Sequence, residues 1–348
     1  MKPGTRIGRH ALILGGSGQI GRAVARELLD QGWRVSSAQR QPDKLPRDLI
    51  ENGLVAIAVN LSDGGAVDDL AEGTFDAVID TVCFNGDDAD RLMTIGRNAA
   101  HLVAISSASV YCDHRGLTLD EGLKHGYPVF DGPIKETQTT VEPGPETYST
   151  RKVAMEQRLL NSADAHVTIL RPAAIHGIGS RHPREWWFVK RALDGRRRVP
   201  LSFRGESRFH TTSAVGIAKL IVQALVHPGT QVLNIADPDA PTVTDIGRTI
   251  SAILNHEWEL IPLEGAPGRD LVGATPWSIP SQITLDLSAS ASIGYRPILS
   301  YAEAVEPYCR WLVETAKSRP WREAFPVIAG YPWDPFDYDA EDARLSGL

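Results

Sequence analysis

The sequence contains few cysteines. The three in its 348 residues, Cys83, Cys112 and Cys309, lie far apart, and none belongs to a C-x-x-C pair or to a cluster with histidine. An odd number of cysteines at such spacing argues against a disulfide framework and against a zinc site. We therefore expect buried thiols and no metal centre.

Long apolar runs and a strong positive charge are also missing. The longest apolar stretches, such as A-L-I-L at 11–14, are far shorter than the roughly 20 residues that a membrane span requires. The start M-K-P-G-T-R lacks the apolar core of a signal peptide. A net charge of −7 gives no broad basic surface for nucleic acid. These absences predict a cytoplasmic protein without membrane or nucleic-acid partners. The single basic run, G-R-R-R at 195–198, is either a solvated helix end or a phosphate-binding cluster.

Short apolar segments alternate with amphipathic stretches through the first half of the chain. This is the pattern of β-α-β units, and it predicts an α/β fold with a doubly wound parallel sheet of the Rossmann type. The expected strands lie at 10–14, 33–37, 54–59, 76–80, 101–106 and 166–170.

The texture of the sequence changes after residue 176, where aromatic and basic clusters and many prolines follow one another. This change indicates a smaller C-terminal substrate lobe, although V-L-N-I-A at 232–236 could return a strand to the sheet. The tail from 331 is either an acidic wrapping segment or partly disordered. We expect the dinucleotide-binding domain at 1–176 and 209–237, the substrate-binding lobe at 177–208 and 238–330, and the acidic tail at 331–348.

Three glycines follow the first expected strand at intervals of three. Gly15, Gly18 and Gly21 stand where that strand gives way to a helix. In such a turn the first glycine permits the tight bend, the second lets the backbone approach a pyrophosphate, and the third lets the helix pack on the strand. The motif predicts a dinucleotide site, with a merely flexible turn as the alternative.

The end of the second expected strand distinguishes NADP from NAD. An NAD site needs a carboxylate there to bind the ribose 2′-hydroxyl. Residues 31–42 contain neither Asp nor Glu, whereas Arg40 lies 19 residues after Gly21. Its planar guanidinium could pair with a 2′-phosphate. NADP is therefore the expected cofactor and NAD is possible, and the alternative for Arg40 is an ordinary surface charge.

A long segment at 112–146, rich in Gly, Pro and acidic residues, precedes an expected helix at 147–162 that opens with a tyrosine and a lysine four positions apart. Loops of that length in compact domains are usually functional or mobile. The Tyr-Lys spacing alone is weak evidence for catalysis, because two polar residues on one helix face are common, and it needs the context of the other motifs.

The motifs together resemble the extended short-chain dehydrogenase/reductase family, the NAD(P)-dependent epimerase/dehydratase group. The resemblance covers about residues 10–315. It is carried by the order of Gly15-x-x-Gly18-x-x-Gly21, S-S-A-S-V-Y at 106–111, Tyr148-x-x-x-Lys152 and I-L-R-P at 169–172.

The resemblance implies roles for individual residues. Tyr148 matches the general acid/base, Lys152 the lysine that binds the nicotinamide ribose and lowers the pKa of the tyrosine, and Ser107 the hydroxyl that holds the substrate oxygen. Glu156 is expected to be a helical ion-pair partner of Lys152. Besides Arg40, the cofactor contacts are expected from Gly15, Gly18, Gln19, Ile20, Gly21, Asn60, Leu61, Thr81, Val82, Tyr148, Lys152, Pro172 and Ile175.

The substrate contacts are less constrained. His176 replaces the family's usual tyrosine and either touches substrate or packs at the hinge between the lobes. Arg208 is either a phosphate-binding arginine or a member of a structural ion pair. Ser109 and Trp187 are further substrate candidates, although each could be purely structural.

The leading functional hypothesis is an oxidoreductase that transfers hydride between NADP(H) and a carbonyl/alcohol pair on a small-molecule substrate. The alternative is a nucleotide-sugar epimerase, or less readily a dehydratase, that oxidises its substrate transiently with bound NAD(P). A third hypothesis is a non-catalytic dinucleotide-sensing or RNA-associated protein, which retention of Ser107, Tyr148 and Lys152 disfavours. The resemblance also implies a homodimer.

Overall fold

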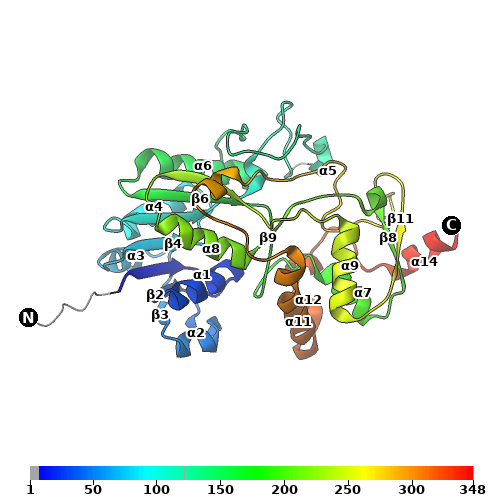
Figure 1. Cartoon of the computed structure of the whole chain (residues 1–348), viewed down its shortest axis with the longest axis horizontal. Helices are drawn as coiled ribbons and strands as arrows, with labels where there is room; N and C mark the ends of the chain where they lie inside the picture. The colour runs from blue at the N-terminus through cyan, green and yellow to red at the C-terminus, as the bar shows by residue number, and fades with distance from the viewer. Residues whose placement is uncertain (1–7, 121, 348) are drawn as a thin grey trace, which may run out of the picture.

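Seven parallel strands form the central sheet of the protein, shown in Figure 1 as a computed structural model that describes residues 8–120 and 122–347. Their order across the sheet is β10-β6-β5-β4-β1-β2-β3. All six strands expected from the sequence are present, and the segment near 232–236 returns to the sheet as its seventh strand. The strands are β1 His10–Leu14, β2 Arg34–Gln39, β3 Val55–Ala58, β4 Ala77–Asp80, β5 His101–Ile105, β6 His166–Pro172 and β10 Gln231–Ile235.

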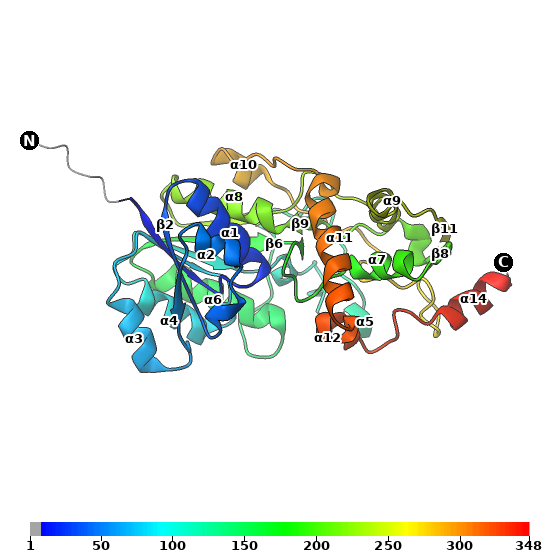
Figure 2. The same cartoon turned by 90° about the horizontal axis from the view of Figure 1, so that it is seen from below.

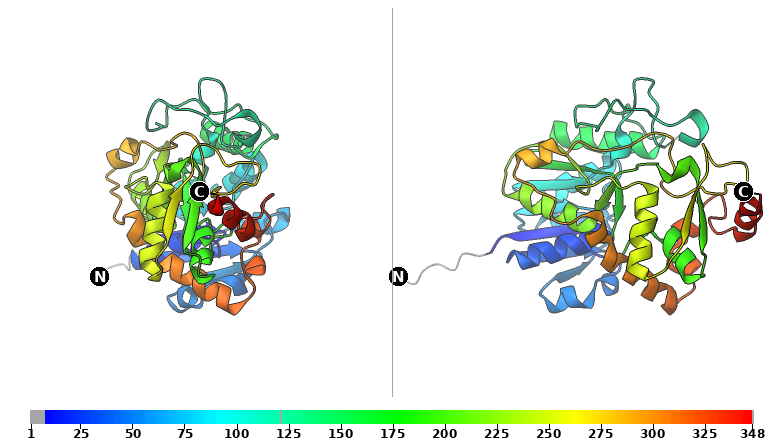
Figure 3. Two further views of the ribbon diagram at one scale, coloured as in Figure 1. Left: turned by 90° about the vertical axis from the view of Figure 1, so that its right-hand side faces the viewer. Right: turned by 45° about the vertical axis from the view of Figure 1, so that its right-hand side comes forward.

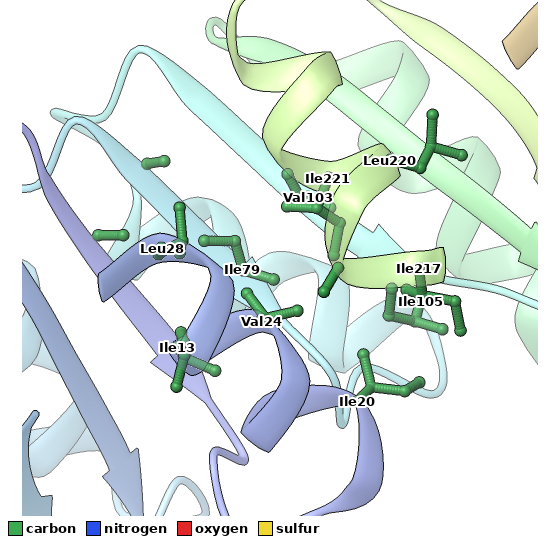
Figure 4. Packing of buried hydrophobic residues seen from close by; sticks show 14 of the residues in the cluster. Ile13, Ile20, Val24, Leu28, Ile79, Val103, Ile105, Ile217, Leu220 and Ile221 are labelled. Carbon is green, nitrogen blue, oxygen red and sulfur yellow. The ribbon is translucent and has the colours of Figure 1, made fainter. Parts of the chain in front are cut away.

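Helices cover both faces of the sheet, which makes the fold doubly wound, as predicted. One face carries α1 and α8, whose buried side chains form one apolar cluster with the strands (Figure 4). The other face carries α3, α4 and α6, and a second cluster fills that side. The bounds are α1 Gln19–Asp30, α2 Arg47–Glu51, α3 Gly64–Ala71, α4 Gly86–Ile95, α6 Tyr148–Ser162 and α8 Ala214–Leu225.

The burial of strand β1 on both faces of the sheet explains why its sequence is an unbroken apolar run. Ala11 and Ile13 join the cluster beneath α1 and α8, whereas Leu12 and Leu14 join the opposite cluster. Strands of a parallel sheet that is buried on both faces do not alternate in polarity. The carboxyl ends of β1, β4 and β5 consequently meet at one edge of the sheet, where ligands bind in folds of this type.

The second lobe lies beside the carboxyl edge of the sheet. Its core is aromatic, and α11 packs against α7 and α9 (Figure 2). A two-stranded parallel sheet pairs β8 with β11, and β7 with β9 forms another. The remaining elements, of which α10 packs against β10 of the central sheet, are β7 Ala174–His176, α7 Trp186–Leu193, β8 Arg198–Leu201, β9 Thr211–Ser213, α9 Val243–Leu254, β11 Glu259–Pro262, α10 Ser288–Ser292, α11 Tyr301–Ser318, α12 Trp321–Ala324 and α13 Pro326–Ala329.

The C-terminal helix α14, Tyr338–Ser346, packs on the outside of the second lobe (Figure 3). Glu341 forms a buried ion pair with Arg191 of α7, and Asp342 pairs with Arg196. Residues 331–347 therefore form a wrapping segment, which is the first of the two predictions made for the tail. Arg196 is used in this contact, and Arg197 donates to the carbonyl of Glu257 at 2.9 Å, so the basic run at 195–198 serves structure.

The long segment at 112–146 is held by backbone pairing rather than by regular elements. Tyr111 and Thr140 form an antiparallel bridge, and Ile134 pairs with Leu285 of the second lobe. A short helix α5, Gly122–His125, and three 3₁₀ turns complete the chain: η1 Pro42–Lys44, η2 Ala108–Val110 and η3 Ser202–Gly205. The segment thus bridges the sheet and the second lobe beside the end of β5.

The three cysteines are buried free thiols, as expected. Across residues 8–120 and 122–347, no group of three or more His, Cys, Asp or Glu side chains is arranged to hold a metal ion. In the same part of the chain, no helix combines the length and apolarity that crossing a bilayer demands.

Candidate active site

The glycine turn between β1 and α1 is shaped as the sequence predicts. Gly15 has φ of +89°, a conformation that side-chain-bearing residues rarely adopt. A Cβ on Gly21 would lie 2.4 Å from the Gly15 oxygen, so only glycine lets the helix approach the turn this closely. A Cβ on Gly18 would lie 3.5 Å from the Gly15 oxygen, an ordinary van der Waals distance, so the protein leaves room for a ligand at that position.

A cleft of about 620 Å³ opens above this turn at the carboxyl edge of the sheet. Its lining comes from the segments at the ends of β1 to β4, which converge there, and also from α4 and the loop at 179–182. Nine of the predicted cofactor residues line it: Gly15, Gly18, Gln19, Ile20, Arg40, Asn60, Leu61, Thr81 and Val82. Gly21 does not line the cleft and acts through the packing of α1.

The polar groups that line the cleft are suited to binding a dinucleotide. The Oε1 atom of Gln19 and the Nε2 atom of Gln39 are buried without a partner among the described residues, and both side chains border the cleft. Such groups favour a polar ligand, since a buried unpaired amide is costly. The glycine turn at the start of α1 supplies the approach that a pyrophosphate needs.

The lining contains basic side chains that the sequence reasoning missed. Lys44 and Arg181 join Arg40 at the cleft. The described side chains around the end of β2 that face the cleft are Gln39, Arg40, Gln41 and Lys44, none of which is acidic. Asp88 also lines the cleft, but it pairs with Arg91 at 2.7 Å. Lys44 could have been noticed from its place four residues after Arg40, whereas Arg181 is distant in sequence.

A second cavity of about 440 Å³ adjoins the cleft, with Gln19 and His182 in the walls of both. Its lining brings together Ser107, Ser109 and Tyr148, as the sequence predicts, with Pro172 and Ile175. The remaining lining comes from Ser106, Ala108, Leu119, Asp120, Ala173, Arg184 and Phe209.

Tyr148 is placed by the start of helix α6. Thr147 and Thr150 form a capping box, and the carboxylate of Asp120 accepts a 2.8 Å hydrogen bond from the backbone nitrogen of Ser149. These caps fix the first turn, so the phenol projects into the cavity with 39% of its surface exposed. The ring of Phe84 lies 5.4 Å from the Tyr148 ring.

Ser107 stands directly after β5 and caps the turn η2 through its side chain, which accepts a 3.1 Å hydrogen bond from the nitrogen of Ser109. It lines the same cavity as the Tyr148 phenol. Burial raises the pKa of Tyr148, while the Ser107 hydroxyl and the charge of Arg184 act in the opposite direction. The phenol is therefore protonated at neutral pH, as a proton donor must be.

Lys152 lies beneath the tyrosine, one helical turn further along α6. Its Nζ donates to the carbonyl oxygens of Cys83 at 2.6 Å and Ile105 at 2.8 Å, and it lies 5.7 Å from the centre of the Tyr148 ring. Burial lowers the pKa of Lys152, and Cys83 and Asp80 oppose that shift. The expected role of Lys152 in lowering the tyrosine pKa remains a proposal, since Ser107 and Arg184 are the groups that lower the pKa of the phenol in this structure.

Asp80, at the end of β4, is a buried acid that the sequence reasoning missed. Its Oδ1 accepts a 2.7 Å hydrogen bond from the nitrogen of Val82, whereas Oδ2 has no partner among the described residues. Burial raises its pKa to about 6. Asp80 and Lys152 both bind the backbone of the turn at 81–83, Asp80 at the Val82 nitrogen and Lys152 at the Cys83 carbonyl. Thr81 and Val82 of this turn face the cleft.

Three of the four substrate candidates lie outside the cavity. Trp187 is fully buried in the aromatic core of the second lobe, and Arg208 donates to the carbonyl of Ala240. His176 is 1% exposed and bonds Asp237 at 2.8 Å, which places it in the packing between the lobes. We correct these three assignments to structural positions. For each of the three, the structural alternative that the sequence left open is the one observed.

The predicted ion pair between Glu156 and Lys152 is wrong. Glu156 accepts hydrogen bonds from Arg171 of β6 at 3.0 and 2.5 Å, and no ion pair joins it to Lys152 among the described residues. Ser109 lines the cavity, and its Oγ accepts a 3.0 Å hydrogen bond from Ser149. Tyr111 is structural, because its hydroxyl donates to Asn234 at 2.7 Å.

Comparison with known proteins gives a family and several structural likenesses. Residues 11–236 match the family described as "NAD dependent epimerase/dehydratase family". MoeE5 in complex with UDP-glucose and NAD is similar at 19% identity over 88% of this chain and 99% of that one, with a TM-score of 0.65. UDP-N-acetylglucosamine 4-epimerase from Methanobrevibacter ruminantium M1, in complex with UDP-N-acetylmuramic acid, gives 18% identity over 88% and 99%, with a TM-score of 0.67.

A third solved structure extends the likeness to a dehydratase. The dTDP-glucose 4,6-dehydratase from Bacillus anthracis str. Ames, in complex with NAD, is 13% identical over 89% of this chain and 98% of that one, with a TM-score of 0.65. Identities this low establish a shared fold only. No curated protein sequence matches the chain.

Proposed function

The chain belongs to the NAD dependent epimerase/dehydratase family of enzymes, and from this premise we propose that it is an NADP(H)-dependent oxidoreductase acting on a carbonyl/alcohol pair. The observation that carries the proposal is that the hydroxyls of Ser107 and Tyr148 line one cavity next to the dinucleotide cleft. The pair is suited to holding and protonating a substrate oxygen.

We assign the following roles to the site residues. Ser107 donates a hydrogen bond to the substrate oxygen and holds it beside Tyr148. The Tyr148 phenol gives its proton to that oxygen as the carbonyl becomes an alcohol, and it takes the proton back in the reverse direction. Lys152 binds the ribose hydroxyls with the N–H that its two carbonyl partners leave free. A bound NADPH would supply the hydride that reaches the carbonyl carbon.

The raised pKa of Tyr148 supports its role as the proton donor in the reduction. Reduction requires a protonated phenol and oxidation a phenolate. Since burial favours the neutral form, the phenol is in the state needed for reduction at neutral pH.

NADP is favoured over NAD by the charge around the end of β2. Arg40 and Lys44 face the cleft where the 2′-position of the adenosine ribose would lie, and no carboxylate is present among the described lining residues there. A 2′-phosphate would find two cations at this point, whereas the 2′-hydroxyl of NAD would find no acceptor of the usual kind.

Nucleotide-sugar epimerisation is the second candidate, and it is favoured by the family and by solved epimerases that contain UDP-sugars. An epimerase oxidises and then reduces one substrate with the same retained dinucleotide. The two candidates therefore differ in whether the cofactor exchanges with solvent.

One experiment separates them. The purified protein is denatured and its released dinucleotide is identified, and the refilled protein is assayed for NADPH oxidation by a panel of carbonyl compounds and for conversion of UDP-glucose. Exchangeable NADP and net NADPH oxidation are expected. Tightly retained NAD with sugar interconversion and no net oxidation would overturn the reductase in favour of the epimerase.

We also propose that the protein is a cytoplasmic homodimer, as the family resemblance suggests. Light scattering coupled to size-exclusion chromatography should give about twice the 37.9 kDa chain mass. A monomer mass at micromolar concentration would refute the dimer.

A further inference from the structure

Arg184 is a half-buried cation in the wall of the catalytic cavity that lacks a carboxylate partner. It lines the cavity together with Ser107 and Tyr148, and its charge reaches the Tyr148 phenol. No ion pair or side-chain hydrogen bond connects it to another described residue, and its one marked contact is with the ring of Phe209, 5.8 Å away.

The other buried or half-buried arginines among the described residues each have a hydrogen-bond or ion-pair partner. Three of them, Arg22, Arg151 and Arg208, donate to backbone carbonyls. Arg91, Arg171, Arg191 and Arg196 have side chains that are at most 18% exposed, and each meets a carboxylate. Removing a cation from water without a partner is costly, so a protein retains such a group where a ligand compensates it. Arg184 therefore differs from these structural arginines.

Two acids near Arg184 also have other partners. Glu185 is buried, the Tyr301 hydroxyl donates to it at 3.4 Å, and its carboxyl feels the charges of His176 and Arg184 without forming an ion pair with Arg184. Asp120, in the lining of the same cavity, accepts from the backbone of Ser149 at the start of α6. Neither forms an ion pair with Arg184, so the guanidinium remains available to a ligand.

The loop that carries Arg184 is fixed in place. His182 bonds the hydroxyl of Tyr331, Pro183 is buried, and α7 begins two residues after Arg184. The pKa of His182 is lowered to about 3 by burial and by the charge of Arg184, so its ring is neutral. A rigid loop spends little entropy when its side chain binds.

Resting on the proposed function, we propose that Arg184 binds a single oxyanion group, a carboxylate or a phosphate, on a small carbonyl substrate whose carbonyl oxygen lies at Ser107 and Tyr148. The apolar side chains of Leu119, Ala173 and Phe209 face the carbon chain between the two groups. The cavity volume of about 440 Å³ lies in the range of small-molecule sites and accommodates a small carbonyl substrate. Arg208, the arginine that the sequence suggested for this task, lies outside the cavity.

The test uses matched pairs of carbonyl compounds with the NADPH-loaded full-length protein. Oxo acids from 2-oxobutanoate to 6-oxoheptanoate are each compared with their methyl ester, and dihydroxyacetone phosphate with dihydroxyacetone. The charged member of the best pair should exceed its neutral partner in kcat/KM by at least about tenfold, the value of a charge-assisted hydrogen bond. The acid and phosphate arms identify which oxyanion is preferred.

Substitutions then assign the preference to Arg184. Arg184→Gln should bring the charged compound down to the level of its neutral partner while leaving the neutral compound within about twofold, and Arg184→Lys should retain part of the preference because it keeps the charge without the fork. Arg208→Gln, a substitution of equal charge change outside the cavity, should leave the ratio intact. An equal loss for both members of a pair would mean that Arg184 is only structural and would overturn the proposal.

A binding measurement makes the outcome independent of turnover. The NADP-loaded protein is titrated by calorimetry with each charged and neutral compound and with UDP-glucose. Arg184-dependent binding of a charged compound supports the proposal, whereas its absence for every acid and phosphate, or tighter binding of UDP-glucose, overturns it. If NADP binds and neutral carbonyls are reduced as well as charged ones, the oxidoreductase function stands and only the role of Arg184 fails.

Discussion

Glu156 forms a buried ion pair with Arg171 of the neighbouring strand, although Lys152 stands one helical turn away on the same helix. The Nε and Nη2 atoms of Arg171 donate to the two carboxylate oxygens at 3.0 and 2.5 Å. Lys152 instead donates to two backbone carbonyls, those of Cys83 and Ile105. The ion pair joins α6, which carries Tyr148, to β6 of the sheet.

Loss of the Glu156 carboxylate should destabilise the fold. Glu156→Gln leaves Arg171 buried without a counter-charge, so the free energy of unfolding should fall by about 3 kcal/mol in urea denaturation. Glu51→Gln, in the exposed pair with Arg47, should produce no measurable change. Equal effects of the two substitutions would show that the Glu156 pair is not buried in solution.

Removal of the Tyr148 hydroxyl should abolish turnover without loss of cofactor. Tyr148→Phe removes the proton donor, so kcat should fall by at least about 100-fold while the dissociation constant of NADPH, measured by its fluorescence, stays within twofold.

For the wild type, the reduction rate should stay level from neutral pH to above the ordinary tyrosine value near 10 and then fall, because the raised pKa of Tyr148 keeps the phenol protonated over that range. A decline centred near pH 7 would contradict this ionisation.

Reversal of the charge at Arg40 should change cofactor preference. In Arg40→Asp the new carboxylate repels a 2′-phosphate and can accept from a 2′-hydroxyl, so NADP should bind at least about 100-fold more weakly while NAD changes little. Arg47→Asp, which carries the same charge change on the exposed helix α2, should preserve the ratio of the two dissociation constants. Equal weakening of NADP and NAD by Arg40→Asp would show that Arg40 does not meet the 2′-phosphate.

Neutralisation of Asp80 should stabilise the protein at neutral pH. Burial raises the pKa of this carboxyl to about 6, so the folded state holds its proton more tightly than the unfolded chain and wild-type stability falls as pH rises from about 4 to about 6. Asp80→Asn removes that cost, which is about 3 kcal/mol for a shift of this size. Its melting temperature should exceed that of the wild type at pH 8 and approach it near pH 4, and the same substitution at exposed Asp69 serves as the control. A pH-independent difference would refute the raised pKa.

A methyl group at Gly21 should disrupt the glycine turn. In Gly21→Ala the new Cβ would lie 2.4 Å from the Gly15 oxygen, so α1 must move away from β1. Dinucleotide affinity and melting temperature should both fall, whereas Gly64→Ala, at a helical position with no atom within 4 Å of the added Cβ, should preserve both. Unchanged NADP binding in Gly21→Ala would show that the turn tolerates the displacement.

Much of the fold could be predicted because its signals are local. The apolar run of β1, the three glycines after it and the capped start of α6 each depend on neighbours in the sequence. The sheet also brings the loops after β1, β4 and β5 to one edge, so the order of the motifs was enough to place Ser107 near Tyr148. The same reasoning could not identify Asp80, whose burial depends on packing from several distant segments.

The sequence by itself determined the Rossmann-type sheet, the glycine turn and the Ser107, Tyr148 and Lys152 set, because strand polarity and motif spacing specify them without knowledge of distant partners. Only the tertiary structure decided which charges are paired. In the folded structure Glu156 forms its ion pair with Arg171, and Arg208 lies outside the cavity. Arg184 lies in the cavity wall and has no carboxylate in an ion pair with it. Such pairings depend on contacts between residues far apart in the chain, and in a low-dielectric interior those contacts determine whether a charge serves the fold or remains available to a ligand.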